Sequence, residues 1–331
     1  MAARIVGVGK YVPEKVLTNA DLERMVETSD EWIVDRTGIR ERRLAAEHET
    51  SATMGAEAAR MALRTAGLGP ENIDLVICAT LSPDGMFPAS ASVIQDSIDA
   101  RNAGAFDVNA ACNGFIAALA SASQFIENRV YERVLVVGSE VLSRIVNWTD
   151  RGTCVLFGDG AGAVLLERGE SGGAGSFVLK SDGSGAKFLY ARGPGSAPAT
   201  LAETEGYCIV MDGREVFRYA VRAMEDCVRQ SLKAAGLEVD DLDYVIPHQA
   251  NQRIISAVAK GLGVPAERVI VNVEKYGNTS SASIPVALCE AWEEGRLKPG
   301  DKLMLVAFGG GMAWGSAVVE WTGLGSCLAK S

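Results

Sequence analysis

Four segments of the chain carry side chains that could do chemistry, and the first places a cysteine at a structural boundary. Cys112 stands in DVNAACNGFIAALASA, between an apolar, extended run and an alanine-rich helix. A helix that begins near Cys112 would direct its unpaired N–H groups and its positive dipole end at the sulfur. Such a site favours the thiolate over the thiol, which makes Cys112 a candidate nucleophile. A small buried core residue is the alternative for this segment alone.

The other three segments supply hydrogen-bonding groups. His248 follows the apolar strand DYVI in IPHQANQRI, at the strand end where α/β proteins place ligands. The second of the two histidines, His48, lies in a charged loop. Asn278 lies in the glycine-flanked turn of EKYGNTSSASIP, and the three glycines of AFGGGMAWGS would let the backbone approach a ligand closely. Taken singly, these segments also fit a structural histidine, a helix cap and a tight turn.

An internal repeat predicts the elements that position these residues. Segments recur at an offset of 169 residues: AGL at 66–68 and 235–237, ENIDLVI at 71–77 and DDLDYVI at 240–246, RVLVV at 133–137 and KLMLV at 302–306. We therefore expect two similar α/β halves, residues 1–170 and 171–331, related by a pseudo-two-fold axis. In this alignment Asn109 matches Asn278, whereas Cys112 matches Ser281. The thiol belongs to the first half, and the histidine and asparagine belong to the second.

The local patterns agree with this architecture. LVICAT and RVLVVGS are nearly continuous apolar runs, which is typical of strands covered by helices on both faces. One helix is expected to be capped near Thr50 and to end at Gly67, and a second is expected to end at Gly236. The glycine-containing segments 170–175 and 191–199 are predicted to be loops.

Composition excludes several classes of function. The chain has 331 residues, 48% hydrophobic, and a formal net charge of −10, which argues against binding to nucleic acid. Its N-terminus lacks a signal-like apolar core, and no run is long enough to span a membrane. The seven cysteines form no CxxC pair and no metal-ligand spacing, so reduced thiols, a cytoplasmic location and no metal site are expected.

Cysteine at a helix start, histidine, asparagine and triple glycine, in that order, form a specific set. Together with TSDEWIVDRTGIRERR (28–43) and LFGDGAGAVLLE (156–167), they resemble the β-ketoacyl-acyl carrier protein synthase III family of thiolase-like condensing enzymes over essentially the whole chain. The resemblance implies a thiolase-like α/β fold, in which two duplicated halves pack as a five-layered αβαβα sandwich. It also implies an initiating enzyme of type II fatty acid biosynthesis. No cofactor is expected, because acyl-CoA and malonyl-acyl carrier protein are substrates.

The resemblance assigns roles to the chemical groups. Cys112 would take a short acyl group, acetyl above all, from coenzyme A, and malonyl-acyl carrier protein would then lose CO₂ and attack the acyl-enzyme. Backbone N–H groups of Cys112 and Gly310 would stabilise the oxyanion. The His248 ring N–H and the Asn278 amide would hold the enolate, and Phe308 would contribute an apolar lining that favours loss of CO₂.

The family pattern also predicts where coenzyme A binds. Trp32 and Arg151 would sandwich the adenine, Thr28 would contact its edge, Arg36 would face phosphate, and Gly213 and Asn251 would line the pantetheine tunnel.

Two partners are expected. An acidic carrier protein needs a local basic surface on this acidic chain. Arg214, Arg218 and Arg222 stand four residues apart on one helical face, and Arg253 and Lys260 share another; family correspondence favours Arg218, Arg253 and Lys260, although a solvated helix face has the same spacing. In the family pattern, Phe87 corresponds to a residue that closes the acyl pocket of a second subunit. This correspondence implies a homodimer and a short primer.

Other classes of protein require residues or features that differ from those of this chain. Elongating condensing enzymes use two histidines, and degradative thiolases use a second cysteine where this chain has FGGGM. Papain-like hydrolases share the order Cys, His, Asn but lack the duplicated halves. A noncatalytic acyl-CoA-binding protein would not need all three residues. A homologue from specialised, polyketide-like metabolism would use the same residues on another primer, and it stays open.

Overall fold

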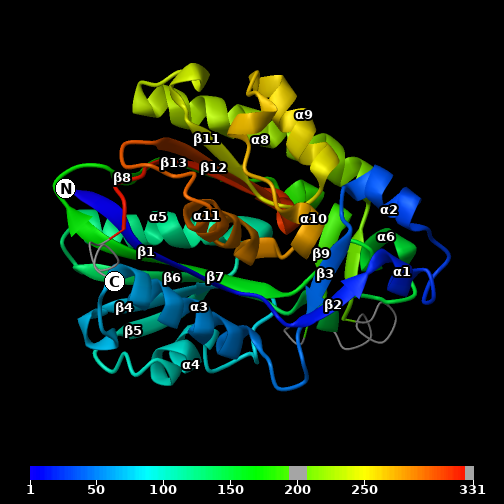
Figure 1. The fold of residues 1–331 in the computed structure, drawn as a ribbon, viewed down its shortest axis with the longest axis horizontal. Coiled ribbons are helices and arrows are strands. Elements are labelled where there is room, and N and C mark those ends of the chain that lie inside the picture. Colours follow the sequence, from blue (N-terminus) through cyan, green and yellow to red (C-terminus); the bar gives the residue numbers. More distant parts are fainter. Residues whose placement is uncertain (194–206, 325–331) are drawn as a thin grey trace.

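The computed structural model describes residues 1–193 and 207–324 and arranges them in five layers (Figure 1). Helices α3 (Ser51–Ala66) and α4 (Ser90–Ser97) cover one outer face, and α8 (Gly213–Ala235) and α9 (Gln252–Leu262) cover the other. Helices α5 (Gly114–Glu127) and α11 (Ser283–Glu293) lie between the two strand layers and contribute to the same buried cluster. This αβαβα order confirms the predicted fold class.

The strand layers are joined into a single hydrogen-bonded sheet. Its order is β11-β12-β13-β8-β1-β7-β6-β4-β5, and β1 meets β8 at one residue pair, Ala3 opposite Ala174. The strands are β1 (Ala2–Tyr11), β4 (Leu75–Ala79), β5 (Gly104–Val108), β6 (Arg133–Glu140), β7 (Gly160–Gly169), β8 (Gly173–Ser181), β11 (Tyr244–Pro247), β12 (Lys302–Gly309) and β13 (Ala313–Glu320). The five strands from β1 to β5 in this order come from the first half of the chain, and the other four come from the second.

Elements of the two halves recur at the offset found in the sequence. β6 and β12 begin and end 169 residues apart, as do the 3₁₀ turns η2 (Ala111–Asn113) and η7 (Ser280–Ala282). Ala111 and Ser280 hold the same left-handed conformation, with φ of 49° and 48°. Each half therefore presents the same turn, followed by a helix, at the boundary between the halves.

The predicted helix ends are confirmed. The Thr50 side chain accepts a hydrogen bond from the backbone N–H of Thr53 at the start of α3, and the helix closes at Gly67. Gly236 closes α8 with the same φ of 68° and ψ of 31° as Gly67. The helix expected at Cys112 begins two residues later, at Gly114, because Cys112 lies in the 3₁₀ turn that precedes it.

One loop prediction is wrong in part. Residues 173–175 of the predicted loop 170–175 belong to β8. Gly173 has a φ of 88° and lies so close to the backbone of Ala3 that no side chain fits between them. Gly173 therefore lies at the junction of the two halves and does not belong to a loop. Of the predicted loop 191–199, residues 194–199 lie outside the described residues, as does Cys327.

Shorter elements surround one end of the sheet. They are β2 (Lys15–Thr18), β3 (Glu41–Leu44), β9 (Leu189–Ala191), β10 (Ile209–Met211), α1 (Asn19–Leu22), α2 (Asp30–Thr37), α6 (Arg151–Cys154) and α10 (Val273–Tyr276). In the part of the chain that the structure describes, no helix has the length and apolarity needed to cross a membrane.

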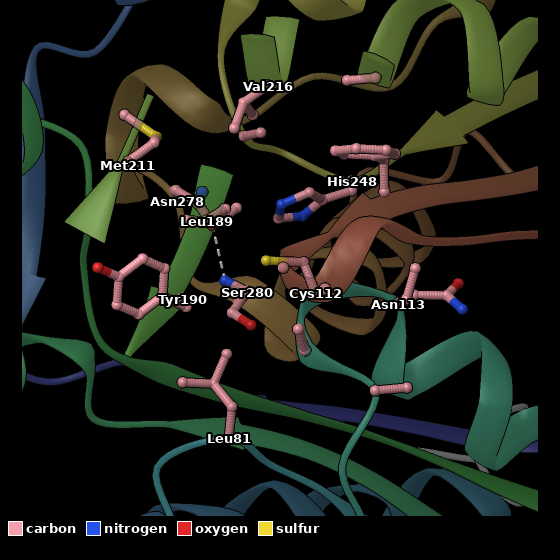
Figure 2. A pocket seen from close by; sticks show the side chains of 18 of the residues that line it. Leu81, Cys112, Asn113, Leu189, Tyr190, Met211, Val216, His248, Asn278 and Ser280 are labelled. Carbon is pink, nitrogen blue, oxygen red and sulfur yellow. Dashed lines mark hydrogen bonds between the residues drawn. The ribbon is translucent and has the colours of Figure 1, made fainter. Parts of the chain in front are cut away.

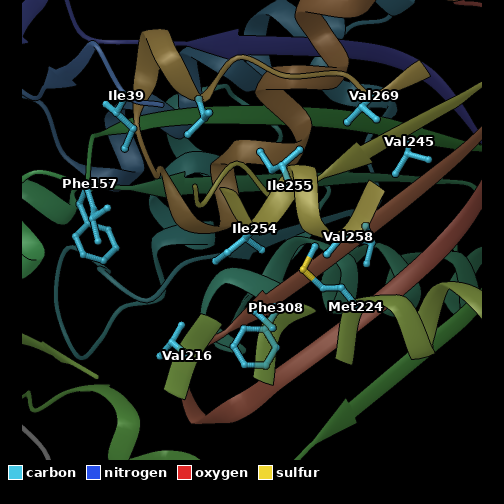
Figure 3. Packing of buried hydrophobic residues seen from close by; sticks show 14 of the residues in the cluster. Ile39, Phe157, Val216, Met224, Val245, Ile254, Ile255, Val258, Val269 and Phe308 are labelled. Atoms are coloured by element: carbon cyan, nitrogen blue, oxygen red, sulfur yellow. The ribbon is translucent and has the colours of Figure 1, made fainter. Parts of the chain in front are cut away.

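A buried apolar cluster fixes the outer helices of the second half against the sheet (Figure 3). Ile255 and Val258 of α9 and Met224 of α8 pack in the same cluster as Val245 of β11. Phe308 of β12 belongs to this cluster and also lines the main cavity. Core packing therefore holds one wall of that cavity in place.

Candidate active site

A cavity of about 820 Å³ lies where the two halves meet, and its lining is mostly apolar. Cys112 from the first half and His248 and Asn278 from the second all line it. Figure 2 shows their side chains directed into this one space. A cavity of this size with few polar groups is the usual form of a small-molecule site.

Burial dominates the chemistry of Cys112. The residue is 8% exposed, and desolvation raises the pKa of its thiol from 9.0 to about 12. The side chain of Ser280 and the backbone N–H groups of Cys112 and Gly310 act in the opposite direction and lower this pKa. Loss of solvent outweighs these hydrogen bonds, so the raised pKa indicates a resting thiol instead of the expected thiolate. The same two N–H groups are the predicted oxyanion donors.

His248 is held firmly at the end of β11. Its backbone N–H donates to the carbonyl oxygen of Val306 at 2.7 Å, and its ring Nδ1 lies 2.6 Å from Oγ of Ser283. The residue is 2% exposed, and burial lowers its pKa to about 3. The imidazole is therefore neutral at physiological pH and can donate one hydrogen bond without carrying charge.

Asn278 is fixed by contacts that leave its amide nitrogen free. Its backbone N–H donates to the carbonyl of Leu156, at 2.8 Å, so a first-half segment anchors it. Its Oδ1 accepts from the backbone N–H of Ser280 at 2.9 Å. Asn109 makes the equivalent contact with Ala111 in the first half, at 3.3 Å. Among the described residues, no acceptor binds Nδ2 of Asn278, which lines the cavity.

The triple-glycine segment brings backbone against the cysteine. It forms the turn η8 (Gly310–Met312) between β12 and β13, so it is both a tight turn and a wall of the cavity. A Cβ atom at Gly309 would lie 2.6 Å from the backbone nitrogen of Cys112, which is too close for any side chain. Phe308 lines the cavity and is 4% exposed.

The residues predicted to hold adenine lie together but in direct contact. The guanidinium carbon of Arg151 is 4.8 Å from the ring centroid of Trp32, and that of Arg36 is 5.8 Å away. A base stacked between Trp32 and Arg151 needs about 7 Å, twice a contact distance. The exposed Arg151 side chain must swing outward to admit one. Oγ1 of Thr28 is buried with no partner among the described residues, which leaves it available to a ligand.

The predicted tunnel residues lie at the edge of the cavity. Gly213 opens α8, Asn251 caps α9, and both line the cavity. The amide nitrogen of Asn251 donates to the carbonyl oxygen of Arg36 at 3.2 Å. This contact connects the cavity to α2, which carries Trp32 and Arg36.

Comparison with known proteins identifies the family. Residues 106–183 match the model described as 3-oxoacyl-[acyl-carrier-protein (ACP)] synthase III, and residues 232–321 match the model of its C-terminal part. The β-ketoacyl-[acyl-carrier-protein] synthase III of Caldanaerobacter subterraneus subsp. tengcongensis is 49% identical over 97% of this chain and 98% of its own length. The chain belongs to the 3-oxoacyl-[acyl-carrier-protein] synthase III family. It is an acyltransferase, the initiating condensing enzyme of fatty acid biosynthesis.

Solved structures agree with this assignment. The 3-oxoacyl-[acyl-carrier-protein] synthase III of Aquifex aeolicus is 48% identical, with a TM-score of 0.91 over 96% of this chain and 100% of its own. The priming β-ketosynthase of the R1128 polyketide pathway has the same TM-score, 0.91, at 37% identity over 97% and 96% of the two chains. The fold is therefore that of the synthase III enzymes, and the polyketide relative is more distant in sequence.

The residues predicted to contact partners lie on the surface of this synthase III. Arg218 on α8 and Arg253 and Lys260 on α9 are exposed, and Arg218 pairs with Glu215. The two helices pack side by side in the outer layer (Figure 1). Phe87 is 86% exposed and does not line the cavity of its own chain. His48 is exposed, outside the cavity, and the described residues contain no group of three potential metal ligands.

Two serines of the site escaped sequence reasoning. Ser280 lines the cavity beside Cys112 (Figure 2). Ser283 contacts His248. Both lie in the segment that was interpreted only as a helix start. The repeat offers a signal, because Ser283 aligns with Gly114 and Ser280 with Ala111. Side chains that one half has and the other lacks are candidates for function.

Proposed function

We propose that this synthase III transfers a short acyl group, acetyl as the favoured primer, from coenzyme A to Cys112 and condenses it with malonyl-acyl carrier protein. The observation that carries the proposal is the cavity at the boundary of the halves. One wall supplies a thiol, and the other supplies a neutral imidazole and an amide nitrogen without a protein acceptor. These are the groups that the two half-reactions need.

In the first half-reaction, the sulfur of Cys112 attacks the thioester carbonyl of acyl-CoA. A carbon–sulfur bond to Cys112 forms, the bond to coenzyme A breaks, and the thiol proton of Cys112 ends on the released coenzyme A. Negative charge develops on the carbonyl oxygen, where the N–H groups of Cys112 and Gly310 would stabilise it. Losing one such donor typically costs about 100- to 1,000-fold in rate.

In the second half-reaction, malonyl-acyl carrier protein loses CO₂ and its thioester becomes an enolate. The Nε2 proton of His248 and the Nδ2 amide of Asn278 would donate to the enolate oxygen. Phe308 and the other apolar lining groups would disfavour the charged carboxylate and so favour loss of CO₂. The enolate carbon then attacks the carbonyl carbon of the acyl group on Cys112 and forms a carbon–carbon bond. The bond between that carbonyl carbon and the sulfur breaks, the sulfur takes a proton from solvent, and a 3-oxoacyl product remains on the carrier.

The surroundings of the cavity support the predicted partners. Coenzyme A would enter past Gly213 and Asn251, with its adenine between Trp32 and Arg151, beside Thr28 and Arg36. The acidic carrier protein would dock on Arg218, Arg253 and Lys260, since α8 and α9 both begin at the edge of the cavity. Exposed Phe87 would enter the site of a second subunit in a homodimer. We place the enzyme in the cytoplasm and assign no cofactor besides its substrates.

A second candidate function is priming of a specialised, polyketide-like pathway. The structural likeness to the R1128 priming β-ketosynthase favours it, although that relative is 37% identical whereas fatty acid synthase III relatives reach 51%. Comparing acetyl-CoA with longer and branched acyl-CoA primers distinguishes the two. A clear preference for acetyl supports the primary pathway.

The test separates the two half-reactions in variants of the second half. We expect His248→Ala and Asn278→Ala to keep acylation of Cys112 by acetyl-CoA within about twofold, while CO₂ release from malonyl-acyl carrier protein falls about 100-fold or more. His48→Ala is the matched control, because that histidine is exposed and outside the cavity. Unchanged CO₂ release in both second-half variants would refute the proposed roles.

A further inference from the structure

A buried serine contacts the catalytic imidazole on the side that faces away from the cavity. Oγ of Ser283 lies 2.6 Å from Nδ1 of His248 and 3.3 Å from the backbone nitrogen of Gln249. Ser283 and His248 are each 2% exposed. This hydroxyl is therefore one of the groups that decide where the imidazole carries its proton.

The direction of the hydrogen bond follows from the available partners. The backbone N–H of Gln249 is a donor, so the serine oxygen accepts from it. Among the described residues, Nδ1 of His248 is the remaining partner of this hydroxyl, so it takes the serine proton as an acceptor. A neutral ring that accepts at Nδ1 carries its hydrogen on Nε2. That hydrogen has no acceptor in the described part of the chain and is free for a substrate oxygen.

The repeat shows that this pairing is an addition to the scaffold. The residues 169 positions before His248 and Ser283 are Ala79 and Gly114. A Cβ atom at Gly114 would lie 3.2 Å from Cβ of Ala79, so the strand end and the helix start also meet in the first half. The scaffold brings these two positions together in both halves. The second half alone equips them with an imidazole and a hydroxyl.

We propose that Ser283 is a positioning residue that holds His248 in the tautomer with its proton on Nε2, directed at the substrate. The proposal rests on the proposed function, in which that proton stabilises the enolate. Ser283 itself touches no reacting atom. Its removal should therefore impair decarboxylation and leave the acylation of Cys112 unchanged.

The experiment compares Ser283→Ala with Ser283→Thr, which keeps a hydroxyl, and with Ser123→Ala as control. Ser123 is also a buried serine, on α5, and its hydroxyl has no partner among the described residues. We expect Ser283→Ala to lower CO₂ release from malonyl-acyl carrier protein about 10- to 100-fold, the range found when a group that orients a metal-bound histidine is lost. We expect Ser283→Thr to restore most of the rate and Ser123→Ala to match the wild type.

The tautomer itself is read by ¹⁵N NMR of protein labelled at histidine. The chain has two histidines, so His48→Gln leaves a single ring signal to assign. We expect a ring protonated at Nε2 in this background, and a mixture of tautomers once Ser283→Ala is added.

Two results would overturn the proposal. One is a Ser283→Ala variant that keeps the Nε2 tautomer and the full rate of CO₂ release. The other is an equal loss of acylation and CO₂ release in Ser283→Ala and Ser123→Ala, which would indicate packing alone. If the wild type neither acylates Cys112 nor releases CO₂, the proposed function fails instead.

Discussion

Burial sets the charge state of the two central side chains. It raises the pKa of Cys112 to about 12 and lowers that of His248 to about 3, so the resting site contains a thiol and a neutral imidazole. Neither group is an ion pair partner of the other. In the proposed reaction the sulfur would lose its proton during acyl transfer, and the developing charge would face the backbone N–H groups of Cys112 and Gly310.

This charge state predicts how the reactivity of Cys112 depends on pH. A thiol with a raised pKa stays protonated below that value, so its thiolate fraction grows about tenfold per pH unit through the neutral range. We expect the rate of alkylation of Cys112 by iodoacetamide, followed by peptide mass spectrometry, to keep rising from pH 6 to pH 9.5. N-acetylcysteine is the reference and should level off near its own pKa of about 8.5. A plateau at Cys112 below pH 8 would contradict this and restore the resting thiolate.

The limits of sequence reasoning are clear for these residues. The types and order of Cys112, His248 and Asn278 predicted that they line one cavity, because the repeat places strand ends and helix starts at a common boundary. The charge of Cys112 could not be predicted, since it depends on how completely the folded chain buries the sulfur. Ser283 was overlooked because a serine at a helix start has an ordinary structural explanation.

At the scale of elements, close backbone contacts hold the cysteine turn. The turn η2 lies against the end of β12, where Gly309 leaves no room for a side chain beside the nitrogen of Cys112. The sequence predicted glycine there for approach to a ligand. In the structure, the group that Gly309 approaches closely is the backbone of Cys112.

A single methyl group tests this contact. We expect Gly309→Ala to push the backbone N–H of Cys112 from its position and to slow acylation by acetyl-CoA about 100-fold, as loss of an oxyanion donor does. Gly175→Ala is the control, because a Cβ there meets no atom within 4 Å. The single-turnover rate of acyl-enzyme formation measures the effect. Equal rates in both variants would show that the contact does not matter.

Elements were predictable where the pattern is local. The caps at Thr50, Gly67 and Gly236 and the strands β4 and β6 follow from short motifs. The start of β8 was missed because Gly173 is needed for a close contact with Ala3 of β1, a strand more than 160 residues away in sequence. No local sequence pattern indicates that contact.

At the scale of the whole molecule, the cavity that we propose as the active site lies between two halves with recurring elements. Matching turns and helices lie on both sides of the cavity. In the proposed function, the side chains that differ between the two halves provide the chemistry. The proposed docking surface would follow the same asymmetry, because the exposed Arg218, Arg253 and Lys260 lie on α8 and α9 of the second half. The net charge of −10 alone would oppose an acidic partner.

Intact-protein mass spectrometry after incubation with a panel of acyl-CoA thioesters tests the central claim most directly. The account predicts one acyl adduct per chain, located on Cys112, strongest for acetyl-CoA and absent from Cys112→Ser under the same conditions. An adduct on any of the other six cysteines, or none with any acyl-CoA, would contradict it.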